Sequence, residues 1–513
     1  MSFVENLKKV LDEQDNVSIT ENGAVGYKTT GKSLLDMNFK VSSYRNRSDK
    51  EIVNDFMTAF FEDKIVAMRW LFYARDVRGG LGERRLFRVI VKYLATHYSA
   101  MMSSLVPLFA EYGRYDDLFC MINSPVKGAV IEYIKNTLTS DMENAIKGKS
   151  VTLLAKWLPS ENASSDETRR LARVIIKELG ISASMYRKML SKIRSYLKIV
   201  ERDMSSNNWE GINYEAVPSK ANLLYNGAFL RHDEERRREF LSSVLRGEAK
   251  INSSVTFPHE IVAKYMSSSY SVKGSVDAGL EAMWKALPDL VNGESSTIVV
   301  ADGSGSMTSL VDSKNSKVSA LNVANAIAIY FAERCSGEFK NKYITFSSRP
   351  RLVNLNGDTL RDNIKIALSH NEVANTNIEA TFDLILQTAV SNKMKQEELP
   401  GNVLIISDME FDCATSGRMS GTLFDTISRK FKAHGYEMPR LVFWNVCSRT
   451  NTIPVKENKY GVALVSGFSI NIINMIMGTS IDPYKLLLEV LMSDRYNAIE
   501  EAITDKVDPN YNT

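Results

Sequence analysis

The chain has 513 residues, of which 44% are hydrophobic and 24% are charged. This length exceeds one ordinary domain, and the composition is that of a globular protein rather than a disordered or fibrous one. The formal net charge of +3 is close to neutral for this length. No global basic field therefore points to nucleic acid, and any such surface has to be local.

The cysteines and histidines are few and lack the spacing of metal ligands. Four cysteines are scattered without paired spacing, and the five histidines form no His-Glu-x-x-His pattern. This argues against a disulfide framework or a zinc site and favours a reducing compartment. The N-terminus has no apolar core of signal-peptide length, and no stretch of about 18 apolar residues occurs. We therefore expect a cytoplasmic protein without a membrane partner.

The first part of the chain has a helical pattern. Residues 1–33 are polar and weakly periodic, which predicts an N-terminal arm. Residues 34–293 carry apolar side chains at three- and four-residue spacing, which predicts an all-α domain. Short breaks at Gly79-Gly80 and Gly113 are typical of stacked antiparallel helix pairs. The clearest predicted helices are 51–61, 64–75, 82–98, 101–111, 115–121 and 168–179.

The pattern changes after residue 293. Residues 294–481 alternate apolar β runs with longer helices, which predicts a doubly wound, parallel α/β sheet. Its predicted strands are 297–301, 342–346, 351–355, 403–407, 441–445 and 462–466, and its predicted helices are 318–335, 377–389 and 422–434. Residues 482–513 form a last helix that Pro483 opens, followed by a polar tail.

Oxygen-bearing side chains follow two of these strands. The first strand ends in Asp302-x-Ser304-x-Ser306, and Asp408 directly follows the run 403–407. Thr376 lies in a turn-like stretch between them. Ligands of open α/β sheets gather outside the carboxyl ends of the strands, and hard cations prefer oxygen donors. These segments therefore predict a site for Mg²⁺ or Mn²⁺, although serine and aspartate after a strand are also ordinary capping residues.

The same residues resemble the metal-ion-dependent adhesion site of von Willebrand factor A domains. The segments 343–347, 405–411 and 257–261 resemble parts of the Ro autoantigen (TROVE) family, which has a helical half followed by an A domain. In that family two glycines usually precede the threonine, whereas Ala374 and Asn375 precede Thr376 here. The resemblance implies a HEAT-like solenoid, ring-shaped in Ro proteins, that binds RNA, and an A domain that recruits a protein partner.

The chemistry of the predicted metal site favours binding over catalysis. Asp302 and Asp408 would balance the charge of the ion through water, and Ser304, Ser306 and Thr376 would coordinate it directly. An acidic side chain of a partner protein would then occupy the open position. No His, Cys or Lys in these segments offers a nucleophile or base, so we expect no enzyme. The alternative is a metal-dependent hydrolase with Glu410 or Asp412 as the base.

The most basic compact segment lies in the helical half. The RNA-binding candidates are Arg75, Arg78, Arg84, Arg85, Arg88 and Arg114, because clustered arginines bind phosphate with forked donors. Asp76 and Glu83 lie within the same segment, so an internal salt-bridge network would use the same arginines.

A different kind of protein would fit the same sequence features. A structural or assembly scaffold, cellular or viral, would use the A domain for metal-mediated protein contacts and bind no nucleic acid. The sequence leaves open which RNA or partner is bound, the cellular or viral origin, the oligomeric state and whether the solenoid closes into a ring.

Overall fold

The computed structural model describes residues 7–8, 11–12, 14–20, 25–268, 271–291, 296–312, 317–371, 377–410, 420–450, 452–454, 462–476 and 482–504. The chain divides into two compact units. One unit, the sheet unit, comprises residues 1–67 and 253–491, and the other, the helical unit, comprises residues 68–252 and 492–513.

The sheet unit is built on six strands. They are β5 (Thr297–Asp302), β6 (Lys342–Phe346), β7 (Leu352–Asn354), β8 (Asn402–Ser407), β9 (Arg440–Asn445) and β10 (Ala463–Ser466). Their order across the sheet is β10-β9-β8-β5-β6-β7. Adjacent strands are parallel except for β6 and β7. The prediction of a fully parallel sheet is therefore wrong at this edge, because β7 follows β6 after a short turn and returns antiparallel.

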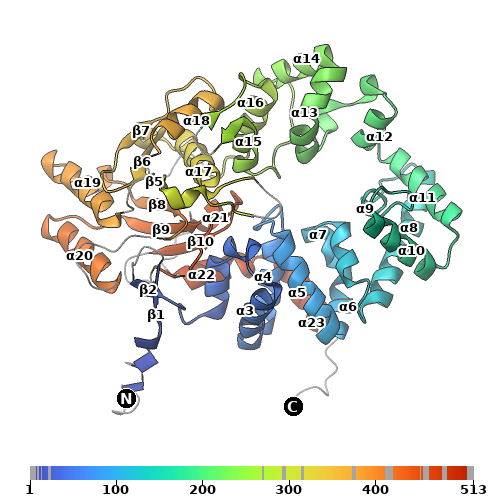
Figure 1. Cartoon of the computed structure of the whole chain (residues 1–513), viewed down its shortest axis with the longest axis horizontal. Helices are drawn as coiled ribbons and strands as arrows, with labels where there is room; N and C mark the ends of the chain where they lie inside the picture. Colours follow the sequence, from blue (N-terminus) through green and yellow to red (C-terminus); the bar gives the residue numbers. More distant parts are fainter. Residues whose placement is uncertain are drawn as a thin grey trace. The chain divides into compact units, whose positions relative to one another are not determined.

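Helices cover both faces of this sheet, as Figure 1 shows. Helices α19 (Ile378–Ser391) and α20 (Ser420–Ala433) pack on one face, where Phe382 and Phe431 meet edge to face at 6.2 Å between ring centroids. Helix α17 (Ala320–Arg334) lies against β5, β6 and β8 and also contacts α15 (Pro258–Tyr265) and α18 (Leu360–Ser369). Because α17 has neighbours on several sides, its side chains from Ala320 to Ala332 are all buried.

The sheet unit also takes in segments that precede the predicted boundary at residue 293. These earlier segments are β1 (Val17–Ile19), β2 (Val25–Tyr27), α2 (Ser33–Phe39), α3 (Asp49–Glu62), α15, β3 (Met266–Ser268), β4 (Ser271–Val272) and α16 (Ala278–Lys285). After the boundary, the unit also contains α21 (Ile472–Ile476) and α22 (Pro483–Leu491). Tyr27 bridges to Ile453, and Phe39 belongs to the core of the sheet. The Asn445 side-chain amide donates to the Phe39 carbonyl at 2.8 Å.

The predicted domains 1–33 and 34–293 therefore differ from the compact units. Part of the predicted arm is a hairpin that is attached to the sheet unit. The predicted C-terminal piece 482–513 is also divided, since α22 belongs to the sheet unit and residues 492–513 to the helical unit.

The helical unit confirms the predicted all-α character of this region. Its helices are α5 (Arg84–His97), α6 (Ser99–Leu105), α7 (Phe109–Tyr112), α8 (Lys127–Ile146), α9 (Leu154–Trp157), α10 (Asp166–Leu179), α11 (Ala183–Tyr196), α12 (Val200–Ser205), α13 (Ser219–His232), α14 (Glu234–Leu245) and α23 (Asn497–Thr504). The unit boundary falls inside α4 (Lys64–Arg75). Neighbouring helices pack in pairs such as α10 with α11 and α13 with α14.

Two predicted helices of this unit differ from the structure. The predicted helix 101–111 is interrupted by a 3-10 turn at Val106–Leu108, where Pro107 lacks the amide hydrogen that a continuous helix needs. The predicted helix 115–121 is a 3-10 helix. Among the described residues, no helix has the length and apolar character needed to span a membrane.

Candidate metal centre

Two of the predicted metal ligands, Asp302 and Asp408, lie at the ends of the central strands of the sheet. Asp302 is the last residue of β5, and Asp408 directly follows β8. The two strands are parallel neighbours, with Ala301 opposite Ile406. The chain continues from β5 to one side of the sheet and from β8 to the other. This is the topological switch point at which open α/β sheets bind ligands.

Hydrogen bonds fix Asp302 and the two serines beside it. One carboxylate oxygen of Asp302 accepts from the Ser304 amide at 2.9 Å, and the other accepts from the Ser407 hydroxyl at 2.6 Å. The Ser304 and Ser306 hydroxyls lie 2.9 Å apart. The structure thus brings together the three residues of the Asp-x-Ser-x-Ser motif. Ser407 is an addition that the sequence did not single out, although it directly precedes Asp408.

Asp408 is buried and only partly satisfied. Its Oδ1 accepts from the Glu410 amide at 3.3 Å, whereas its buried Oδ2 has no hydrogen-bond partner among the described residues. The Arg449 guanidinium lies 3.6 Å from this oxygen, beyond hydrogen-bond distance. Burial and then the neighbouring charge of Asp302 raise the pKa of Asp408 to about 7, against the opposing hydrogen bond from Ser306. The two carboxylates therefore destabilise each other when both are ionised.

This arrangement of donors suits a hard cation. Two carboxylates and two hydroxyls supply only oxygen, which Mg²⁺ and Mn²⁺ prefer, and a divalent ion would relieve the repulsion between Asp302 and Asp408. The described residues contain no group of three His, Cys, Asp or Glu side chains that could hold a metal, so a cation at this position would need the serine hydroxyls as further ligands. Thr376, the fifth predicted ligand, lies outside the described residues.

Asn371 lies close to the Asp302-x-Ser304-x-Ser306 motif. A Cβ atom on Gly303 would lie only 3.1 Å from the Cα atom of Asn371. A larger residue at position 303 would therefore displace this backbone. The side-chain nitrogen of Asn371 is buried and has no hydrogen-bond partner among the described residues. Asn371 thus adds an unsatisfied polar group beside the motif.

Glu410, the proposed base of the hydrolase alternative, is bound to the loop that follows β9. Its Oε1 accepts from the amides of Arg449 at 2.9 Å and Thr450 at 3.0 Å. The Thr450 hydroxyl donates to both carboxylate oxygens at 3.1 Å. These bonds engage both carboxylate oxygens of Glu410 with the loop and hold Arg449 near Asp408. Asp412 lies outside the described residues.

Calorimetric titration of the full-length protein should detect binding of Mg²⁺ or Mn²⁺, and Asp302→Ala should abolish it by removing one of the two buried carboxylates. Asp383→Ala is the matched control, because Asp383 is a half-exposed carboxylate of the same unit that pairs with Lys430 at 2.8 Å. This control should bind the ion as the wild type does. Unchanged metal affinity in Asp302→Ala would refute the site.

Three of the predicted RNA-binding arginines form ion pairs inside the helical unit. Arg75 is buried, and its guanidinium contacts the buried Asp117 at 2.7 and 2.8 Å. Arg88 donates to the same Asp117 at 2.6 Å and pairs with Asp116 at 2.9 Å. Arg114 pairs with Asp116 and stacks over the Trp157 ring, 4.0 Å from its centroid. An internal ion-pair network therefore uses Arg75, Arg88 and Arg114.

Asp76, one of the two acids expected in this network, pairs with the Arg495 guanidinium at 2.8 Å and accepts from the Arg78 amide at 2.9 Å. The glycine break also has a packing role, since a Cβ on Gly80 would lie 1.9 Å from the Tyr73 carbonyl oxygen.

The prediction that Arg75 contacts RNA is wrong, because its side chain is only 3% exposed and is paired with Asp117. Of the other candidates, Arg78 and Arg84 are exposed, Arg85 is half-buried, and Arg78 donates to the Glu111 carbonyl at 3.0 Å.

Asp117→Ala should destabilise the helical unit by about 3–5 kcal/mol, because it leaves the buried Arg75 without its counter-charge. Arg84→Ala, at an exposed position of the same cluster, should change stability by less than about 0.5 kcal/mol. Urea denaturation followed by circular dichroism measures both. Equal stability of the two variants would show that the network contributes little to the fold.

Comparison with known proteins places these features in context. Residues 296–510 match the family model of a domain of unknown function, DUF7788, and residues 127–295 match another, DUF2828. The chain is 31% identical over 517 aligned positions to the uncharacterized protein L728 of Acanthamoeba polyphaga mimivirus, covering 93% of this chain and 87% of the viral protein. The described metal-site residues all lie within the first matched segment.

The crystal structure of the Ro (RSR) protein of Deinococcus radiodurans aligns with a TM-score of 0.35 and 13% identity, covering 78% of this chain and 93% of that one. This similarity is too low to establish a shared fold.

Proposed function

This chain belongs to the same protein family as the mimivirus protein, and we propose that it is a non-catalytic binding protein that captures a partner through a divalent cation. In this proposal the sheet unit is a von Willebrand factor A-type domain. Residues Asp302, Ser304, Ser306 and Asp408, with Thr376, hold Mg²⁺ or Mn²⁺.

One observation carries the proposal. Asp302 and Asp408 are both 1% exposed and lie at the switch point of the sheet. The Oδ2 atom of Asp408 makes no hydrogen bond among the described residues. Burying an ionised carboxylate without full compensation is costly, so such a pair usually serves a bound cation or a function. Arg449 supplies part of the compensation from 3.6 Å.

The side chains that hold the ion indicate which kind of partner group would bind to it. When bound, the ion supplies a hard, positively charged position that favours an anionic oxygen ligand. Asp302 and Asp408 balance its charge, while the neutral hydroxyls of Ser304 and Ser306 leave it electron-poor. A carboxylate from an acidic side chain of a partner protein fits this position.

A binding role agrees better with the surroundings of the site than hydrolysis does. Glu410 is already engaged as an acceptor of hydrogen bonds from the amides of Arg449 and Thr450 and from the Thr450 hydroxyl. Ser304 and Ser306 hydrogen-bond each other, and no histidine or lysine contact is found at either hydroxyl among the described residues.

RNA binding by the helical unit is the second part of the proposal. It rests on the resemblance to the Ro family in sequence, and the arginines available for it exclude Arg75. The alternative is a protein scaffold, cellular or viral, that uses the metal site alone. The two differ in one property, since only the first binds RNA in a salt-sensitive manner.

An array of synthetic acidic peptides tests the metal-dependent part. Binding of the full-length protein to some of them should require Mg²⁺ and should be lost with chelator. Ser304→Ala should weaken this binding by removing one direct ligand, with little change in stability, because a small hydroxyl at a strand end contributes little to the core. Thr388→Ala, which removes an exposed hydroxyl of α19 in the same unit, is the control and should bind normally.

Hydrolytic assays test the alternative for the same site. Metal-dependent turnover of phosphate esters or peptides that disappears in Asp408→Ala would overturn the non-catalytic proposal. Peptide binding that persists in chelator would overturn the role of the ion.

A further inference from the structure

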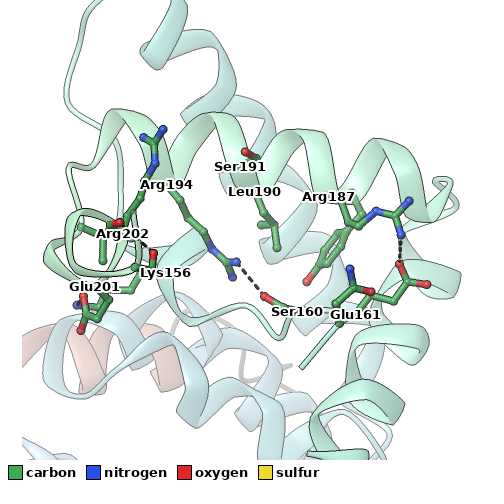
Figure 2. A pocket seen from close by; sticks show the side chains of 13 residues that line it. Lys156, Ser160, Glu161, Arg187, Leu190, Ser191, Arg194, Glu201 and Arg202 are labelled. Carbon is green, nitrogen blue, oxygen red and sulfur yellow. Dashed lines mark hydrogen bonds and ion pairs between the residues drawn. The ribbon is translucent and has the colours of Figure 1, made fainter. Parts of the chain in front are cut away.

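The helical unit carries three adjoining hollows along α11. The largest has a volume of about 670 Å³ and lies between α11, the segment 156–162 and α12, and Figure 2 shows its lining. A second, of about 490 Å³, shares Ser191 and Arg202 with the first. A third, of about 420 Å³, shares Lys188 and Lys192 with the second. Neighbouring hollows share side chains and therefore adjoin one another, and we call the three together the α11 groove.

Basic side chains predominate in this groove. The acidic side chains that line it are Glu161 and Glu201, and the basic ones are Lys156, Arg187, Lys188, Lys192, Arg194 and Arg202. Both acids are already paired: Arg187 contacts Glu161 at 3.0 Å, and Lys156 lies 3.7 Å from Glu201. An excess of positive charge therefore remains, although the chain as a whole is close to neutral.

Arg194 has a structural role in the wall of the largest hollow. It donates to the carbonyl oxygens of Ala155 and Leu158 at 2.8 Å each and to the Ser160 hydroxyl at 2.9 Å. Figure 2 shows its side chain reaching from α11 toward Ser160. These bonds fix the segment 155–160 against α11, so the wall of the groove is rigid.

The middle hollow is the most suitable part for an anion. Lys188, Lys192 and Arg202 line it, and none of the described residues around it is acidic. Lys188 and Lys192 are exposed and form no ion pair among the described residues. They are one helical turn apart, about 6 Å along the axis, which is close to the spacing of successive phosphates in a nucleic-acid strand.

An aromatic ring lies in the same hollow. Tyr196 follows Lys192 by one turn of α11 and is 38% exposed. The hydroxyls of Ser191 and Ser195 also line it. Unpaired cations beside an exposed aromatic ring are the features with which proteins hold single strands, the cations contacting phosphates and the ring stacking on a base.

We propose that the α11 groove binds single-stranded RNA, with Lys188, Lys192 and Arg202 contacting the phosphates and Tyr196 stacking on a base. This inference rests on the RNA-binding part of the proposed function and moves the contact surface from the arginine cluster to α11. Single-stranded RNA is favoured over an acidic peptide because the aromatic ring and the hydroxyls accompany the charges.

Fluorescence anisotropy of the full-length protein with a labelled oligouridylate tests the proposal. Lys188→Glu/Lys192→Glu should weaken binding by about tenfold or more. The slope of log affinity against log salt should decrease in magnitude by about 1.4, because each phosphate that a lysine neutralises contributes about 0.7. Tyr196→Ala should weaken binding by about tenfold without changing the slope, whereas Tyr196→Phe, which keeps the ring, should bind normally.

A matched double variant controls for charge. Lys135 and Lys250 are exposed lysines of the same unit that line none of the three hollows, so Lys135→Glu/Lys250→Glu should bind as the wild type does. RNA binding that survives unchanged in Lys188→Glu/Lys192→Glu would overturn the groove and leave the proposed RNA function intact. Failure of the wild type to bind any RNA pool would overturn both. Polyglutamate binding as tight as oligouridylate binding, with no effect of Tyr196→Ala, would overturn the proposal in favour of an acidic peptide.

Discussion

The parallel pairing of β5 with β8 is the constraint on which the candidate metal site depends. It places Asp302 and Asp408 at the same end of the sheet, where the Ser407 hydroxyl, at the end of β8, donates to Asp302 at 2.6 Å. Two buried carboxylates in this arrangement repel each other, and the surrounding protein compensates them incompletely. The topology of the sheet thus places two carboxylates close enough to repel each other, and a divalent cation between them would relieve this repulsion.

Short-range patterns in the sequence were sufficient to predict that Asp302 and Asp408 lie at the same end of the sheet. Each β run of the sheet is apolar and bounded by polar residues, so the ends of β5 and β8 could be read directly, and parallel strands bring their ends together. Arg449 and Glu410 could not be assigned in the same way. Arg449 lies 41 positions after Asp408 and approaches it only because Glu410 binds the backbone of the loop after β9.

The domain boundaries were harder to predict, because they depend on contacts distant in sequence. Residues 34–67 have the helical pattern of the segment that follows them, yet Phe39 packs in the core of the sheet and Asn445 binds its carbonyl. The arginine cluster shows the same limit. The positive charge of the cluster suggested phosphate binding. The carboxylates that neutralise it belong to Asp116 and Asp117, which lie in a different predicted helix, 115–121. The lysines of α11 were overlooked because exposed lysines on a helix are common, and only the hollows distinguish them.

The free energy of unfolding of the wild type and of Asp408→Asn, each measured in chelator and in Mg²⁺, tests the central claim most directly. Asparagine is nearly isosteric with aspartate but removes the charge that opposes Asp302. In chelator the variant should therefore be at least as stable as the wild type, and Mg²⁺ should stabilise only the wild type. A variant that is less stable in chelator, or that gains as much stability from Mg²⁺ as the wild type does, would contradict the account of a carboxylate pair maintained for a cation.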